Sequence, residues 1–296
     1  MGAVILGAGI SSDKSVMGSV EHAILAAKEC LKVAKVDAED VDFIINTGIY
    51  RENNIVEPAV AMLIQKELGM NGDYVKAANG KDSFGFDLLN GGIGALNALK
   101  IADSMLESGA VRYVLIVGGD SHPSNSEVAG FPYTTLGSAL LLGKGKDPKK
   151  GIQGSAFRSK QHAGQGRMSY IEMTKVGVSG RQSMTITTDK DYVPAAKDLA
   201  IELAKDFITK NKIKSSELQL ISTQLSADFS QDIAKSIGVS PDSSLSLFAT
   251  FGDVHSAVFG LGFHQLQSLK RAAAGTQVLF VGAAAGLDAG VVHYVC

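Results

Sequence analysis

One succession of elements, an amphipathic helix followed by a polar turn and an apolar strand, occurs twice along this chain of 296 residues. The first copy reads LAAKECLKVAKVDAEDVDFIIN at Leu25–Asn46, and the second reads LAIELAKDFITKNKIKSSELQLIS at Leu199–Ser222. A helix, a glycine-containing turn and a strand then follow in each copy, at Ile101–Asp120 and at Leu266–Gly282. Self-similarity of this kind indicates a duplicated unit, so we expect two similar halves.

The strands are predicted from short runs of aliphatic or β-branched residues. They are expected at Ala3–Leu6, Phe43–Asn46, Tyr113–Val117, Ala139–Leu142, Leu218–Ser222, Val278–Val281 and Val291–Val295. Amphipathic helices are expected between them, at Val20–Ala34, Val60–Leu68, Gly91–Ser108, Val193–Lys210 and Ser256–Ala273. Most strands are apolar throughout, which is typical of sheets covered by helices on both faces. Strands that alternate with helices predict an α/β protein.

The connection between the halves is expected in Gly151–Gln182, the stretch with the weakest pattern, which is rich in Gly, Ser and Arg. Such residues, clustered between periodic segments, are typical of loops. We therefore expect an N-terminal half at residues 1–165 and a C-terminal half at residues 166–296.

The charge balance excludes several classes of function. The chain has 28 Lys and Arg against 30 Asp and Glu, scattered along its length, so no basic stripe is available to bind nucleic acid. No apolar run reaches the ~18 residues of a membrane span, and the N-terminus lacks the features of a secretory signal. We expect no nucleic-acid or membrane partner and a cytoplasmic location.

The two cysteines, Cys30 and Cys296, form neither a CxxC motif nor a pairing pattern, which indicates a reducing compartment. Cys30 is predicted to be a small core residue of the first helix. Neither cysteine is a good candidate nucleophile, because a nucleophile needs a partner base. The five histidines other than His255, namely His22, His122, His162, His264 and His293, show no ligand spacing, and we expect no metal and no cofactor.

Motifs at four places resemble one known family. They are FDLLNGGIGALNAL at Phe86–Leu99, FGDVHSAVFGLGF at Phe251–Phe263, VRYVLIVGGD at Val111–Asp120 and the glycine loop GAAAGLDAGVV at Gly282–Val292. Together they resemble the ketoacyl-ACP synthase III branch of the thiolase superfamily, and most of all its olefin-type, head-to-head acyl condensing enzymes. The resemblance implies an α/β thiolase-like fold, in which two similar halves form a five-layer α-β-α-β-α arrangement.

The resemblance also implies three catalytic positions, and this chain departs at each. The family's nucleophile is a Cys whose pKa is lowered at the start of the central helix, and here the matching residue is Gly92. Thr223 stands in place of a His and is no general base at neutral pH. Asp253 stands in place of an Asn and, when ionised, would repel the oxyanion that the Asn stabilises.

Two further features of the resemblance concern partners. Between its first strand and its first helix, the family usually has a few tens of residues that include the side chains contacting the adenine of coenzyme A. Here the link from Gly9 to Glu21 is short and lacks them. Dimers of the family form through the strand after the central helix, here around Tyr113–Gly118.

Glu57, in the sequence VEPAVA, matches the Glu-Pro motif of the olefin-type enzymes, in which the glutamate serves as base in the partner's active site. A structural interpretation of Glu57 stays open, because an acidic residue and a proline are both favoured at the start of a helix. Two interpretations also stay open for His255, which lies two residues after Asp253. Either the pair faces the pocket as a new acid/base or metal site, or His255 packs against backbone; two ligands alone make no metal site.

The three departures lead us to expect a catalytically degenerate ketoacyl-ACP synthase III-like subunit of fatty-acid or polyketide biosynthesis. It would form a homodimer, or a heterodimer with an active homologue to which it lends Glu57. One alternative is a stand-alone acyltransferase, thioesterase or decarboxylase that uses Asp253, His255 and Thr223 without a covalent intermediate. The other is a non-enzymatic module that binds an acyl thioester or acyl carrier protein.

Overall fold

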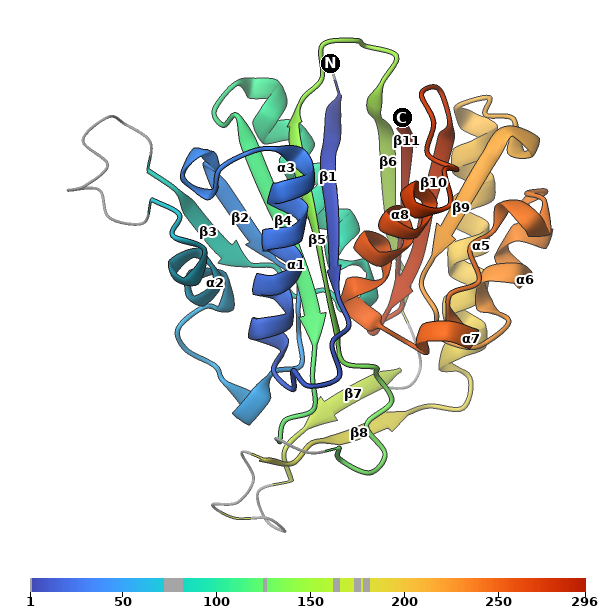
Figure 1. The fold of residues 1–296 in the computed structure, drawn as a ribbon. Coiled ribbons are helices and arrows are strands. Elements are labelled where there is room, and N and C mark those ends of the chain that lie inside the picture. The colour runs from blue at the N-terminus through green and yellow to red at the C-terminus, as the bar shows by residue number, and fades with distance from the viewer. Residues whose placement is uncertain (1, 72–81, 125–126, 162–165, 173–176, 178–181) are drawn as a thin grey trace.

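The computed structural model describes residues 2–71, 82–124, 127–161, 166–172, 177 and 182–296. Two sheets stand beside each other, with helices between them and on their outer faces (Figure 1). The first sheet has the order β1-β5-β4-β2-β3, with β1 Ala3–Ser11, β2 Phe43–Asn46, β3 Phe84–Asp87, β4 Tyr113–Asp120 and β5 Leu136–Lys144. The second has the order β6-β11-β10-β9, with β6 Gly151–Ser159, β9 Leu218–Ser222, β10 Gln277–Ala284 and β11 Asp288–Val295. An antiparallel pair, β7 Arg167–Tyr170 and β8 Thr185–Thr188, lies apart from both sheets.

Three separate hydrophobic cores divide the molecule into five layers. The helices are α1 Ser19–Ala34, α2 Val60–Leu68, α3 Gly94–Ser108, α5 Tyr192–Lys210, α6 Phe229–Ile237, α7 Phe248–Phe251 and α8 Val258–Ser268. One core joins α1 and α2 to the outer face of the first sheet. The largest core encloses α3 and α8 between the two sheets, and the third joins α5 and α6 to the second sheet. This α-β-α-β-α order confirms the predicted architecture.

The two sheets repeat one pattern of strand directions. In the first, β2 is parallel to β4, while β4 and β1 are both antiparallel to β5. In the second, β9 is parallel to β10, while β10 and β6 are both antiparallel to β11. The parallel pairing of β3 with β2 also has a short counterpart, in the isolated bridge between Leu220 and Ser244. The duplication predicted from the sequence is therefore confirmed.

The predicted strands and helices are present, with altered ends. Single 3-10 turns, at Gly91–Ile93 and His255–Ala257, lead into α3 and α8, and α8 ends at Ser268. The expected connection, Gly151–Gln182, contains the strands β6 and β7. Their sequence shows no continuous apolar run because β6 is an outer strand of its sheet and β7 is largely exposed. The predicted boundary between the halves lies next to residues 162–165, outside the described residues, and stays a prediction.

The strand that we expected to form the dimer interface lies inside the first sheet. β4 is hydrogen-bonded to β2 on one side and to β5 on the other. Because both edges of its backbone are paired, Tyr113–Gly118 cannot add a partner strand, and that expectation is wrong. The outer strands of this sheet are β1 and β3.

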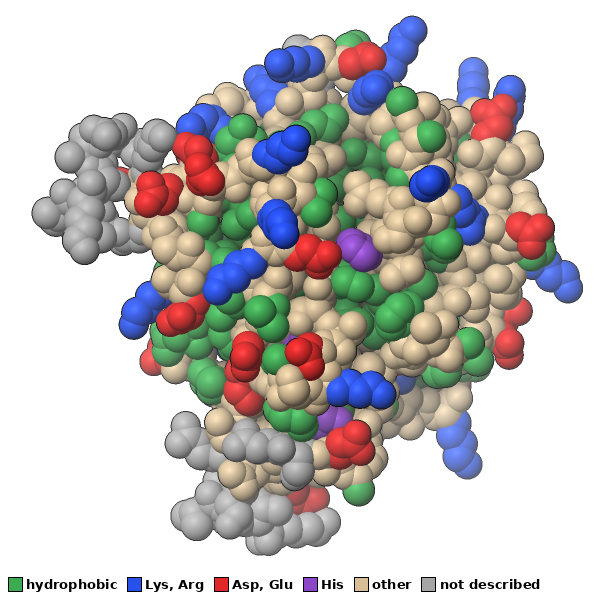
Figure 2. All heavy atoms as spheres, viewed as in Figure 1, with side chains coloured by type: hydrophobic (Ala, Val, Ile, Leu, Met, Phe, Trp, Pro, Cys, Tyr) green, Lys and Arg blue, Asp and Glu red, His purple; other side chains and the backbone are tan. Residues whose placement is uncertain are grey.

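The surface agrees with the scattered charges of the sequence. Figure 2 shows Lys and Arg interspersed with Asp and Glu on the face toward the viewer. Among the helices of the described ranges, none combines the length and the apolar character needed to cross a membrane.

Candidate functional site

The first turns of the two central helices, Gly91–Ile93 and His255–Ala257, meet in the middle of the molecule. An ideal Cβ placed on Gly92 would lie 3.0 Å from Thr223 Cγ2 and 3.8 Å from the carbonyl oxygen of His255. Gly92 is buried, and it lines a cavity of about 240 Å³ together with His255. The structure therefore brings three of the sequence-predicted positions, Gly92, Thr223 and His255, to one place.

Thr223 directly follows β9 and is buried. Its hydroxyl oxygen accepts a hydrogen bond from the backbone N–H of Ala283 at 3.2 Å. Its own N–H donates to the carbonyl of Val281 on the neighbouring strand. Thr223 thus serves to join β9 to β10 beside Gly92.

His255 is paired with Asp120, a residue that the sequence analysis treated only as the end of a strand. Nδ1 of His255 lies 3.1 Å from Oδ2 of Asp120, and Asp120 is completely buried. An ionised carboxylate only accepts hydrogen bonds, so Nδ1 carries the proton and donates it. The ring orientation of His255 is therefore set by a buried carboxylate on β4.

Asp120 is held by an unusually complete set of donors. Its Oδ1 accepts from the N–H groups of Ile49 and Tyr50, at 3.0 and 2.8 Å. Its Oδ2 accepts from the N–H and the hydroxyl of Ser256 as well as from His255. Burial by itself raises the pKa of Asp120, but the charge of His255 and these hydrogen bonds outweigh it and lower the pKa. Asp120 is therefore ionised throughout the neutral range.

Asp253 does not make the side-chain pair with His255 that the sequence suggested. Its Oδ1 accepts the backbone N–H of His255 at 2.9 Å, and its Oδ2 lies 3.8 Å from Nη1 of Arg167. Burial raises the pKa of Asp253, although His255 and Arg167 oppose this shift. Asp253 is absent from the residues that line the cavity beside Gly92 in the described part of the chain. Its contacts support the turn that precedes α8.

Aromatic rings and one arginine, which sequence reasoning missed, form the wall of this cavity. The ring of Tyr133 stacks on His255 with centroids 4.3 Å apart, and Tyr50 stacks on Tyr133 at 4.8 Å. Nη1 of Arg167 donates to the Tyr133 hydroxyl at 3.1 Å, and its guanidinium lies over the Tyr192 ring at 5.4 Å. Burial raises the pKa of Tyr192 to about 12. These residues come from separate loops and strands, so no local motif marked them.

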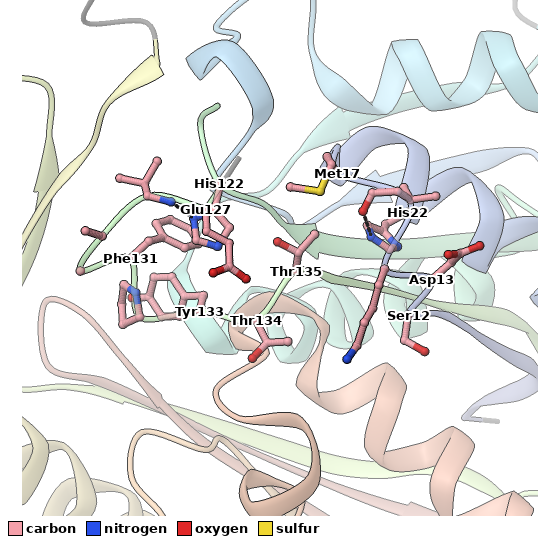
Figure 3. Close-up of a pocket in the computed structure, with 16 residues that line it drawn as sticks. Ser12, Asp13, Met17, His22, His122, Glu127, Phe131, Tyr133, Thr134 and Thr135 are labelled. Atoms are coloured by element: carbon pink, nitrogen blue, oxygen red, sulfur yellow. Dashed lines mark hydrogen bonds between the residues drawn. The ribbon is translucent and has the colours of Figure 1, made fainter. Parts of the chain in front are cut away.

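A second cavity, of about 770 Å³, lies where the shortened link between β1 and α1 faces the loop between β4 and β5. Figure 3 shows His122, Phe131 and Tyr133 on one side of it, and His22 and Asp13 on the other. Nδ1 of His122 accepts the N–H of Val128 at 2.9 Å, which holds this loop. Burial lowers the pKa of both His22 and His122.

Glu57 is exposed and lies just before α2, whose first helical residue is Val60. The N–H groups of Val60 and Ala61 are occupied by the carboxylate of Asp87, at 2.9 and 2.8 Å. Asp87 is held in turn by an ion pair with Arg51. Asp87 therefore provides the hydrogen bonds that cap α2.

The two cysteines lie in poor positions for nucleophilic chemistry. Cys30 is buried on the face of α1 that packs against the first sheet, and burial raises the pKa of its thiol to about 12; burial raises the pKa of Cys296 to about 11. The reactive thiolate form is therefore scarce at neutral pH. Within the described ranges, no three His, Cys, Asp or Glu side chains come together as metal ligands.

Comparisons with known proteins agree with this architecture. A family model described as 3-Oxoacyl-acyl-carrier-protein (ACP) synthase III C terminal matches residues 208–295. The chain is similar to an acyl-CoA:acyl-CoA alkyltransferase of Xanthomonas campestris pv. campestris, with 23% identity over 96% of this chain and 83% of that protein. It is also similar to a beta-ketoacyl-acyl-carrier-protein synthase III of Sodalis glossinidius, with 25% identity over 78% of this chain and 70% of that protein.

Solved structures show the same fold. A 3-oxoacyl-(acyl carrier protein) synthase III, FabH, from Pseudomonas aeruginosa superposes with a TM-score of 0.83 at 18% identity, covering 100% of this chain and 98% of that one. A variant of OleA from Xanthomonas campestris superposes with a TM-score of 0.77 at 18% identity, covering 100% and 99%. The resemblance and the fold predicted from the sequence are confirmed.

Proposed function

We propose that this ketoacyl-ACP synthase III-like protein is a catalytically degenerate subunit, which pairs with an active homologue in acyl-condensing chemistry of the fatty-acid or polyketide type. Its relatives carry names that place them in acyl-group chemistry. One observation carries the proposal. At the start of the central helix, where the family resemblance implies a Cys, the cavity is lined by Gly92. Glycine has no side chain to hold an acyl group, so the covalent half of a condensation has no attachment point here.

The neighbouring polar groups support the loss of this chemistry. The hydroxyl oxygen of Thr223 is bound to the Ala283 N–H, and the carboxylate of Asp253 is bound to the His255 N–H and faces Arg167. Neither group is available in the role that the family assigns to its position. All three catalytic positions of the family are affected. A change that only adjusts one step of the condensation therefore does not account for the three substitutions.

A pairing surface is available at the outer strand β3. Among the described strands β3 pairs with β2 alone, and an outer strand with an unpaired edge is a template for a strand of another chain. Large apolar side chains are exposed on and near it: Phe84 is 63% exposed, Leu89 51% and Val56 82%. Through Asp87, the end of β3 is hydrogen-bonded to the start of α2, directly after the segment that carries Glu57. A partner bound at β3 would therefore meet Glu57, which we propose as the base lent to its active site.

Coexpression tests this proposal. The chain is produced together with a homologue from the same organism that retains the family's Cys, His and Asn, and copurification and condensation by the complex are measured. Glu57→Gln is expected to lower condensation by roughly 10²–10⁴-fold, as for a lost general base, while assembly is kept. Glu67→Gln, at an exposed glutamate on α2, is the matched control and should leave the rate unchanged. Undiminished condensation in the Glu57→Gln complex would reject the lent base, and the absence of any complex would reject the pairing.

The rival functions give different results in the same assays. A stand-alone enzyme acting on acyl thioesters would release thiol without a partner, and a binding module would bind thioesters without turnover. The contact between Asp120 and His255 favours the first of these rivals. We also propose a cytoplasmic location, because the two cysteines form no pairing pattern, which indicates a reducing compartment.

A further inference from the structure

His255 has one ring nitrogen engaged and one available. Nδ1 donates to the buried carboxylate of Asp120, and no residue in the described part of the chain is hydrogen-bonded to Nε2. The residue lines the cavity beside Gly92. With the proton on Nδ1, Nε2 presents a lone pair. A carboxylate that fixes the tautomer and orientation of an imidazole in this way is the arrangement of a general base and its positioning residue.

The backbone at His255 is held in a conformation that few side chains favour. Its φ is +43°, in the left-handed region that is uncommon for residues other than glycine. Asp253 binds the His255 N–H, and Asp120 binds the following N–H of Ser256, so both neighbouring carboxylates hold this turn in place. Residues kept in sparsely populated conformations cluster at functional sites. The turn therefore fixes the imidazole against Tyr133 and beside Gly92.

The cavity suits a small acyl group and a water molecule. Its volume of about 240 Å³ lies below the ~300–1,000 Å³ of sites for larger ligands. Tyr50, Tyr192 and Leu225 supply rings and an aliphatic side chain, whereas backbone of Gly91 and Gly92 forms the wall at the start of the central helix. Gly92 adds no side chain to this wall, and a water molecule occupies about 30 Å³.

We propose that His255, positioned by Asp120, is a general base that hydrolyses short acyl thioesters in this cavity with no covalent intermediate. Nε2 takes a proton from water, and the water oxygen forms a bond to the thioester carbonyl carbon. The C–S bond then breaks, and the leaving sulfur receives the proton from Nε2. One water and one thioester give one carboxylic acid and one thiol, with no oxidant or reductant. The substrate class rests on the proposed function, because the similarity to acyl-condensing proteins selects thioesters.

Thiol release by the purified full chain tests this proposal. The probes are N-acetylcysteamine thioesters of acetate, butyrate and octanoate, which lack the nucleotide of coenzyme A. We expect turnover of the two short substrates, slower turnover of octanoyl, and incorporation of one ¹⁸O into the acid from labelled water. His255→Asn should lower the rate by roughly 10²–10⁴-fold. Asn tolerates a positive φ, so this variant keeps the turn.

Three further variants distinguish a general base at His255 from a residue with only a structural role. His255→Gly suits the positive φ and leaves space for free imidazole, and added imidazole should restore thiol release. His293→Asn changes a histidine on β11 that pairs with Gln277, and its rate should equal that of the unchanged protein. Asp120→Asn should lower the rate of thiol release and alter how that rate depends on pH. The nearby charged and titratable groups also contribute to this pH dependence; they are Asp253, Arg167, Tyr50 and Tyr133.

The outcomes distinguish this proposal from the pairing proposed above. Thiol release that is equal in the unchanged chain and His255→Asn overturns the general base, as does an acyl adduct on the protein. Failure of imidazole to restore His255→Gly also counts against it. Assembly with a homologue is measured separately, so a complex that forms without His255-dependent hydrolysis overturns only the present inference. Hydrolysis without assembly overturns only the pairing.

Discussion

Thr223 occupies part of the space that a side chain at position 92 needs, because an ideal Cβ on Gly92 would lie 3.0 Å from Thr223 Cγ2. That distance is shorter than ordinary van der Waals contact, and the threonine must move by a few tenths of an ångström to relieve it. The two departures from the family pattern thus fit each other. A cysteine at position 92 is accommodated after a small shift, so its introduction is a fair test of the site.

No acyl-enzyme is expected to form on the unchanged chain, because Gly92 has no nucleophile and burial raises the pKa of both cysteines. Intact-mass spectrometry after exposure to acyl thioesters should show no adduct. Gly92→Cys should acylate slowly, since Thr223 is no base, and Gly92→Cys combined with Thr223→His should acylate faster by about 10²-fold or more. A stoichiometric adduct on the unchanged chain would contradict the assignment of Gly92.

Free coenzyme A is expected to bind weakly. The link between β1 and α1 is short, and the larger cavity beside it is lined by the carboxylates of Asp13 and Glu127 against the single ammonium of Lys14. This balance repels the phosphates of the nucleotide. Calorimetric titration should give a dissociation constant weaker than micromolar, that is, a binding free energy less favourable than about −8 kcal/mol. Tighter binding would mean that another surface recognises the nucleotide.

Phe84→Lys is expected to block assembly with a homologue and leave the fold intact. Phe84 lies on the outer strand β3 with 63% of its surface exposed, so its replacement disturbs little packing. A lysine on an outer strand opposes pairing with another chain. Leu269→Lys, at an exposed leucine just after α8, is the matched control. Analytical ultracentrifugation measures the assembly, and equal assembly by both variants would place the interface elsewhere.

Asp253→Asn is expected to change how stability depends on pH. Burial raises the pKa of Asp253, so this group stabilises the fold below its unfolded pKa of about 3.9, and the contribution is lost as the pH rises through the folded value. Asn keeps an oxygen for the His255 N–H and does not titrate. The free energy of unfolding of the variant, minus that of the unchanged protein, should therefore increase from about pH 3.5 to about pH 7. Urea unfolding of both proteins at several pH values measures this difference, and a difference that does not change with pH would contradict the assignment.

Local patterns in the sequence were sufficient for most of the architecture. Buried strand residues such as Ile44 on β2 and Leu115 on β4 lie in apolar runs of the sequence. The two copies of the helix–turn–strand succession indicated the duplicated fold. The motifs around Gly92 and Asp253 located the region of the site. These features depend on neighbours within a few residues or on a repeat, and both are visible along the chain.

The pairing of His255 with Asp120, across 135 residues, was decided only by the tertiary structure. The sequence suggested Asp253, two residues away, but that carboxylate is bound by the His255 backbone N–H and directed toward Arg167. Likewise Asp87, on β3, caps α2 in place of the nearby Glu57. Residues far apart along the chain are neighbours in space here, because the parallel strands and the two central helices bring their ends to one place. Hydrogen bonds then form between the groups that the packed sheets make adjacent. The elements were therefore readable along the chain, whereas the partners of its charged groups depended on how those elements pack.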